Sequence, residues 1–169
     1  MSVLCCHIPH FLTALACRQT PAWRGRPLAL VGPDERVWAV APEAQQCGVQ
    51  VQMRPQQAQV CCPEVLLRDL DVDASQTAQA EVLAVASRWE LPVEPLTWGA
   101  LYVDLHLVGR SAESVRPLAV ELGQRLRATG GDALQPALGW DSGKFTAHAA
   151  AMQVAPGRVR LVDKTEERR

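Results

Sequence analysis

The stretch Thr97-Trp98-Gly99-Ala100-Leu101-Tyr102-Val103-Asp104 decides the fold, because it contains a turn between two neighbouring strands. Apolar and polar residues alternate over 101–107, which is the pattern of a half-buried strand. Residues 93–98 form a second short strand pattern, and Gly99 and Ala100 supply the turn between them. This stretch therefore predicts an antiparallel hairpin within a larger sheet.

A second informative stretch is Cys6-His7-Ile8-Pro9-His10-Phe11, which follows an apolar run at the N-terminus. Residues 2–8 predict a buried strand. From Pro9 onward apolar residues recur at helical spacing, and proline is tolerated in the first turn of a helix. The stretch thus predicts a strand that leads directly into a helix.

The remaining pattern predicts an α+β fold of ferredoxin-like type, with a mixed or antiparallel sheet and helices on one face. Helices are expected over 75–89, with Ser75 as the N-cap, and over 114–128 and 143–154, and strands over 135–140 and 158–162. Shorter elements, including a hairpin over 28–41, fill the region between the first helix and residue 75. We expect one domain from 1–18 and 75–162, a small insertion over 19–74, and a charged tail over 163–169.

Composition sets limits on function. The chain has 169 residues, 48% of them hydrophobic and 21% charged, with a net charge of −1 and a pI near 6.4. Nucleic-acid binding would therefore need a local basic patch. We see neither an apolar run long enough to span a membrane nor an export signal, and the six cysteines lack zinc or disulfide spacing. These features predict a cytoplasmic protein with reduced thiols.

Several local motifs, in order along the chain, resemble one known family. They comprise the opening strand and helix over 4–16, then Pro21-Ala22-Trp23-Arg24-Gly25-Arg26-Pro27, Gly48-Val49 with Met53, Ala58 to Pro63, the hairpin over 93–104, and Gly139-Trp140-Asp141-Ser142-Gly143-Lys144-Phe145-Thr146-Ala147. Together they resemble the palm and fingers of the Y-family, or translesion, DNA polymerases, which include UmuC-like proteins. The resemblance implies a palm domain carrying a small inserted fingers subdomain, and it ends before thumb and little finger.

The chain departs from that family at the positions that hold catalytic metal ions. The family's acidic residues fall on His7, Pro9, Gly99 and Ala100. Two-metal nucleotidyl transfer needs carboxylates, and these four residues supply none. The positions that contact the incoming nucleotide are also changed, to Leu12, Pro42, Gln45 and His148. We therefore expect no bound metal, no cofactor and no enzyme activity.

This pattern is similar to the ImuB-like branch of the family, whose members resemble catalytically degenerate assembly factors. That resemblance implies an accessory role in bacterial DNA repair, translesion synthesis and SOS mutagenesis. It also implies contacts with a replicative-type polymerase, a RecA-like protein or a clamp, with weak DNA binding and no membrane. The candidate phosphate-binding residues are Lys144, Arg158, Arg160, Arg24 and Arg26.

Other interpretations stay open at this point. Cys5, Cys6, His7 and His10 are soft metal ligands, although strand alternation sends Cys6 to the face opposite Cys5 and His7. A separate, second hypothesis is a small cytoplasmic enzyme that uses cysteine and histidine on a ferredoxin-like scaffold, for which no nucleophile–base pair can be assigned from the sequence. A third hypothesis is a decayed polymerase fragment without function. Asp104 remains near the hairpin, but one carboxylate is a poor Mg²⁺ site.

Overall fold

The computed structural model describes residues 2–162, and these fall into two compact units. The large unit comprises Met1–Pro9 and Gln79–Arg169, and the small unit is His10–Ala78. The boundaries expected near residues 18 and 75 lie inside two helices, α1 (Phe11–Gln19) and α4 (Val72–Ala86). The expected tail lies outside the described residues. Assignment of the units as palm and fingers stays a prediction.

The large unit is built on a five-stranded sheet in the order β5-β6-β1-β7-β8. Its strands are β1 (Val3–His7), β5 (Val93–Thr97), β6 (Ala100–Asp104), β7 (Ala137–Asp141) and β8 (Val159–Leu161). The central strand β1 is antiparallel to β6 and β7, whereas β8 runs parallel to β7. Leu4, Cys5 and Cys6 are all 0% exposed. A strand that is apolar on both faces is stable only where both faces are covered, which explains its central place.

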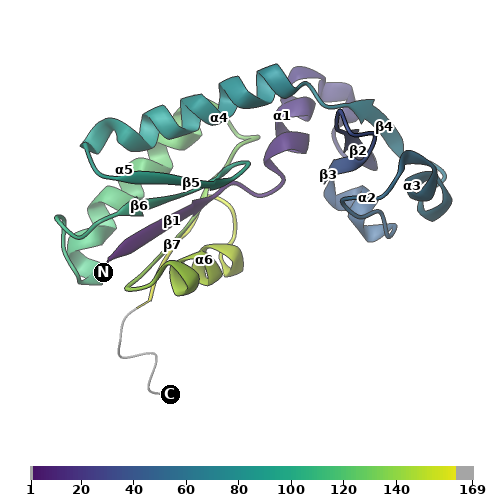
Figure 1. Cartoon of the computed structure of the whole chain (residues 1–169). Coiled ribbons are helices and arrows are strands. Elements are labelled where there is room, and N and C mark those ends of the chain that lie inside the picture. The colour runs from purple at the N-terminus through teal and green to yellow at the C-terminus, as the bar shows by residue number, and fades with distance from the viewer. Residues whose placement is uncertain (1, 163–169) are drawn as a thin grey trace, which may run out of the picture. The chain divides into compact units, whose positions relative to one another are not determined.

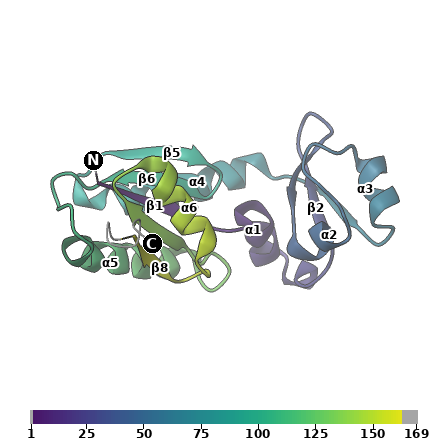
Figure 2. The same cartoon turned by 90° about the horizontal axis from the view of Figure 1, so that it is seen from below.

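Helices cover both faces of this sheet, not one face as expected. Leu138 and Gly139 are consecutive in β7, so their side-chain positions lie on opposite faces. Leu138 contacts α5 (Ala112–Gly130) near Gly123, while Gly139 lies against the backbone of α6 (Lys144–Gln153). Figures 1 and 2 show α5 and α6 on different sides of the strands. The physical reason is that the parallel β7–β8 pair needs a crossover, and α6 provides it.

The predicted hairpin is present as β5 and β6, joined at Trp98-Gly99. Gly99 has a φ of 71°, a conformation that glycine adopts without steric cost. The strand prediction for residues 101–107 is too long, because β6 ends at Asp104. The Asp104 Oδ1 atom accepts a hydrogen bond from the His106 backbone N–H at 2.9 Å, which turns the chain away from the sheet.

The helix predicted over 75–89 is found as α4, followed by a short 3₁₀ turn, Ser87–Trp89. The prediction that Ser75 caps it is wrong. Ser75 lies within the helix, and its hydroxyl donates to the Asp71 carbonyl, while Asp71 Oδ1 accepts from the Ala74 N–H. An aspartate at the start of a helix caps it in the same way as serine. In α5 the corresponding cap is Ser111, whose hydroxyl accepts from the Ser114 N–H.

The small unit contains a three-stranded sheet in the order β3-β2-β4. Its elements are α1, a 3₁₀ turn at Pro21–Trp23, β2 (Leu28–Val31), β3 (Val37–Val40), α2 (Pro42–Gln46), α3 (Pro55–Cys61) and β4 (Leu66–Asp69). The predicted hairpin over 28–41 is present as β2 and β3, and β4 adds in parallel to β2. The core consists of small residues such as Ala29, Ala44 and Ala58. In the described part of the chain, no helix has the length and apolar character needed to cross a membrane.

Candidate nucleic-acid site

The structure brings together three of the four positions at which the metal-binding acids were expected to be missing. His7, the last residue of β1, lies directly opposite Ala100 of β6. The Gly99 carbonyl accepts a hydrogen bond from the Ile8 N–H at 2.8 Å. The Gly99 N–H in turn donates to the side chain of Gln79 in α4, also at 2.8 Å. We call this group, His7, Ile8, Gly99 and Ala100, the turn region.

The turn region is apolar and closed apart from the His7 imidazole. Ala100 is 0% exposed. The His7 ring meets the ring of His148 from α6 edge-on, with 6.5 Å between their centroids. Pro9 follows directly and offers no ligand atom. A pair of Mg²⁺ ions needs several carboxylate oxygens, so these residues do not fit such a centre. Across residues 2–162, no three His, Cys, Asp or Glu side chains are grouped so as to hold a metal ion.

Asp104, an acid of the hairpin, lies at the end of β6 opposite Ala100. Asp104 pairs with Val3 in the register, whereas Ala100 pairs with His7. Four residues of strand correspond to roughly 13 Å. The His106 backbone N–H lowers the pKa of Asp104, and the His106 ring adds to that effect at 3.1 Å. Asp104 therefore ends a strand and is remote from the turn region.

Lys144, a predicted phosphate contact, makes two contacts that the sequence did not reveal. It forms an ion pair with Glu94 of β5, and its ammonium lies 5.5 Å from the centre of the Tyr102 ring. A cavity of about 320 Å³ adjoins these residues, with a lining of Val3, Pro92, Val93, Glu94, Tyr102, Asp104 and Lys144. We call Glu94, Tyr102, Asp104 and Lys144 the charged face.

Burial raises the pKa of Tyr102, and the neighbouring Lys144 ammonium acts in the opposite direction. Sequence reasoning missed Glu94 and Tyr102 as partners of Lys144. The available signal was register, because Glu94 and Tyr102 lie opposite each other in the predicted hairpin and so share a face of the sheet. Their contact with Lys144 depends on how α6 packs, which no local pattern specifies.

Arg158 and Arg160 lie at the opposite edge of the large unit's sheet from β5. Arg160 belongs to β8, the edge strand opposite β5, and it donates to the Gln153 side chain at 3.0 Å. Two strands, β1 and β7, lie between β8 and β6, so β8 and β6 are three strand spacings apart, or roughly 14 Å. Arg158 is exposed and directly precedes β8. These arginines do not extend the surface around Lys144, and their contact with phosphate stays a prediction.

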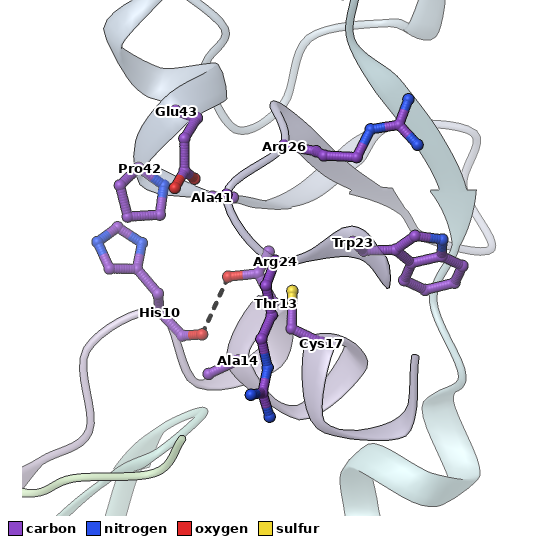
Figure 3. Close-up of a pocket in the computed structure, with 11 residues that line it drawn as sticks. His10, Thr13, Ala14, Cys17, Trp23, Arg24, Arg26, Ala41, Pro42 and Glu43 are labelled. Atoms are coloured by element: carbon purple, nitrogen blue, oxygen red, sulfur yellow. Dashed lines mark hydrogen bonds between the residues drawn. The ribbon is translucent and has the colours of Figure 1, made fainter. Parts of the chain in front are cut away.

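Arg24 and Arg26 lie in the small unit beside a cavity of about 220 Å³ (Figure 3). The cavity lining also includes His10, Cys17, Trp23, Pro42 and Glu43. Figure 3 shows the two arginine side chains leaving the backbone in different directions. Trp23 is partnered by a different residue, since the Arg68 guanidinium lies 5.6 Å from its ring centre. The geometry therefore does not converge on one anion, and DNA contact by this pair also stays a prediction.

The thiols nearest to His7 are poor nucleophiles. Burial raises the pKa of Cys5 to about 12, and it raises the pKa of Cys6 further. The thiolate is the reactive form, and it is scarce at neutral pH under these conditions. Cys5 and His7 share a face of β1, whereas Cys6 points to the other. The structure gives no support to the alternative of an enzyme based on these cysteines.

Solved structures share this fold over almost the whole chain. DinB from Sulfolobus solfataricus superposes with a TM-score of 0.86 at 18% identity, covering 98% of this chain and 49% of that one. A Y-family DNA polymerase chimera gives 0.85 at 17% identity, covering 98% and 50%. These likenesses confirm the α+β fold class and the expected Y-family architecture. The chain spans about half the length of these structures.

Curated relatives point the same way. A DNA polymerase IV from Shewanella oneidensis is 30% identical over 98 residues, which cover 56% of this chain and 28% of that protein. A DNA polymerase IV from Akkermansia muciniphila is 29% identical over 119 residues, covering 69% and 32%. The chain thus spans about a third of the length of these relatives.

These names correct one expectation. We predicted from the missing acids that the chain is not an enzyme, and its similarity to proteins named as polymerases contradicts that prediction. Residue types at four positions describe one metal site, and they do not define the activity of a family member. The family model described as impB/mucB/samB matches residues 6–151, which is most of the sequence, and the chain therefore belongs to this family.

Proposed function

We propose that this chain acts in bacterial DNA repair, in translesion synthesis, as an accessory component that binds DNA weakly and contacts partner proteins in the cytoplasm. The proposal rests on family membership and on relatives named as DNA polymerase IV. Within the family we place it with the ImuB-like proteins of SOS mutagenesis, because of the residues found at positions 7, 9, 99 and 100.

One observation carries this proposal. The large unit keeps the family's sheet, yet its turn region is closed by backbone hydrogen bonds and carries no carboxylate. Basic side chains remain on the surface, at Lys144, Arg158 and Arg160. Cationic side chains bind the phosphate backbone without a metal ion, in proportion to the counterions that they release. We therefore expect DNA affinity that depends on salt and does not depend on Mg²⁺.

The surface of the large unit also supports protein contacts. Phe145 of α6 is 83% exposed and Leu107 is 74% exposed. Large apolar side chains on a surface are used more often for binding proteins than for binding a charged polymer. The partners that we propose are a replicative-type polymerase, a RecA-like protein or a clamp, each to be tested by pull-down with the purified chain.

The test of DNA binding is fluorescence anisotropy with a labelled primer–template duplex. Affinity is measured across a salt series, with and without Mg²⁺, and primer extension is followed in the same samples. We expect weak binding that falls linearly with the logarithm of salt concentration and is unchanged by Mg²⁺. Absence of binding at low salt would contradict the DNA part of the proposal and leave only protein contacts.

A further inference from the structure

We propose that Glu94 competes with nucleic-acid phosphate for Lys144, so that the carboxylate occupies a phosphate-binding position on the charged face. This inference rests on the proposed DNA binding and names the residue that limits it. In this account Lys144 contributes little to DNA affinity while Glu94 holds it, and phosphate gains access by displacing a side chain of the protein itself.

The geometry brings the competitor and its target together from distant parts of the sequence. Glu94 lies opposite Tyr102 in the β5–β6 register, and Lys144 is the first residue of α6. The Lys144 ammonium pairs with the Glu94 carboxylate and lies 5.5 Å from the centre of the Tyr102 ring. One carboxylate oxygen therefore occupies the position at which an anionic phosphate oxygen would meet the ammonium.

The ion pair between Lys144 and Glu94 is exposed enough for a phosphate to displace the carboxylate. The Lys144 and Glu94 side chains are 43% and 60% exposed. Exposed ion pairs contribute little to stability, because water screens the charges and two long side chains must be ordered. A phosphate carried by a DNA backbone therefore competes on nearly equal terms, and the local charge decides the outcome.

That local charge is unfavourable for DNA in the wild-type chain. The cavity beside the contact is lined by two carboxylates, Glu94 and Asp104, and by one ammonium, Lys144, so the sum of −2 and +1 is −1. The backbone hydrogen bond from His106 lowers the pKa of Asp104, which keeps that carboxylate charged at neutral pH. Replacing Glu94 by glutamine brings the sum to zero and releases the ammonium.

The binding experiment compares variants with the labelled primer–template duplex across a salt series. Glu94→Gln is expected to bind several-fold more tightly than wild type and to steepen the salt dependence by about one released counterion. Lys144→Met alone is expected to change affinity little. In the double variant, the gain produced by Glu94→Gln is expected to disappear, because that gain acts through Lys144.

A matched control separates this effect from a general change of net charge. Glu121 forms an ion pair with Arg125 in α5 at 2.7 Å, and both side chains are about half exposed. Glu121→Gln removes the same charge from the same unit. If Glu121→Gln increases DNA affinity as much as Glu94→Gln does, bulk charge explains the effect and the proposal is overturned.

Tyr102 gives a readout that does not need DNA. It is the only tyrosine in the sequence, so chain labelled with fluorotyrosine gives a single ¹⁹F resonance. The ring is buried, at 8% exposure, and contacts the Lys144 ammonium. Lys144→Met and Glu94→Gln are both expected to shift this resonance, whereas Glu121→Gln is expected to leave it unchanged. A resonance insensitive to Lys144→Met would mean that the contact does not form in solution.

The outcomes distinguish this inference from the proposed function. If wild type binds DNA and Glu94→Gln binds it with the same affinity, the inference is overturned and the proposed DNA binding stands. If Glu94→Gln binds DNA and wild type does not, the result supports the competition directly. Absence of binding by wild type and by Glu94→Gln overturns the proposed DNA binding and the inference with it, whatever the ¹⁹F spectrum shows.

Discussion

The turn region and the charged face share β6, the first at Ala100 and the second at Tyr102 and Asp104, and they differ in how their polar groups are used. In the turn region the backbone groups of Ile8 and Gly99 are paired, and Ala100 is fully buried. At the charged face, Glu94 and Lys144 pair at the surface beside an open cavity. The comparison shows that one sheet carries a closed apolar group and an exposed ionic one, and the anion contact that we propose lies at the second.

The largest expected effect comes from disturbing the helix that serves both regions. A Cβ atom added at Gly139 would lie 2.2 Å from the Ala147 carbonyl oxygen and 2.3 Å from the Ala151 nitrogen, both of them backbone atoms of α6. Gly139→Val is therefore expected to displace α6 and to lower the free energy of unfolding by about 3 kcal/mol. Thermal or urea unfolding measures this, with exposed Ser142→Ala as the control. A variant as stable as wild type would show that α6 does not pack tightly against β7.

A smaller but more specific effect is expected from placing a carboxylate in the turn region. Ala100→Glu puts an acid in a fully buried position, and we expect the free energy of unfolding to fall by about 2 kcal/mol. Burial raises the pKa of such a carboxyl above its unfolded value. The loss of stability is therefore smallest at low pH and grows as pH rises through the unfolded pKa towards the folded pKa.

The control for that substitution is Thr97→Glu, because Thr97 is exposed on the neighbouring strand. Its expected effect on stability is small and nearly independent of pH between neutral and mildly acidic conditions. If both glutamates behave alike in urea unfolding at several pH values, the turn region is open to solvent and the contrast between the two regions is lost.

Removing one hydrogen bond from the turn region is expected to have a moderate effect. Gln79 accepts from the Gly99 N–H at 2.8 Å, and Gln79→Ala leaves that buried donor without the side-chain oxygen. We expect a loss of about 1 kcal/mol in the free energy of unfolding. Faster amide exchange at Gly99 than at Val103 would identify the site of the loss, whereas unchanged exchange at Gly99 would contradict the assigned contact.

The smallest effect is expected at Asp104, which belongs to the charged face. Because the His106 N–H lowers its pKa, the stability that Asp104 contributes is present above its unfolded pKa and is lost as pH falls through the folded value. The carboxylate is partly exposed, so the contribution is roughly 0.5 kcal/mol. Asp104→Asn is expected to flatten the acid limb of a stability–pH profile. An unchanged profile would show that the turn at His106 does not depend on the charge.

The comparison also shows which features the sequence could predict. Alternation over residues 101–107 predicted the hairpin, and the apolar run at Leu4, Cys5 and Cys6 predicted a buried strand. Helix α4 was predicted, but its cap was misassigned, because Asp71 and Ser75 are both good capping residues and tertiary context selects between them. The prediction of helices on one face failed because local sequence patterns do not specify the direction of β8 relative to β7. That direction depends on the topology of the whole sheet.

The candidate site was only partly predictable for the same reason. The meeting of His7 with Gly99 and Ala100 followed from the resemblance, since that family brings these positions together. The contact of Glu94 with Lys144 joins residues fifty positions apart, and it depends on how α6 crosses the sheet. Periodicity within a segment specifies a face of that segment, whereas packing between segments specifies which faces meet.

The most direct test of the account compares the salt dependence of primer–template binding by wild type and by Glu94→Gln, with and without Mg²⁺. We predict that affinity is unchanged by Mg²⁺ in both proteins, and that Glu94→Gln binds several-fold more tightly with a slope steeper by about one. Binding that requires Mg²⁺, with the same slope in the two proteins, would contradict it and would return the DNA contact to the turn region.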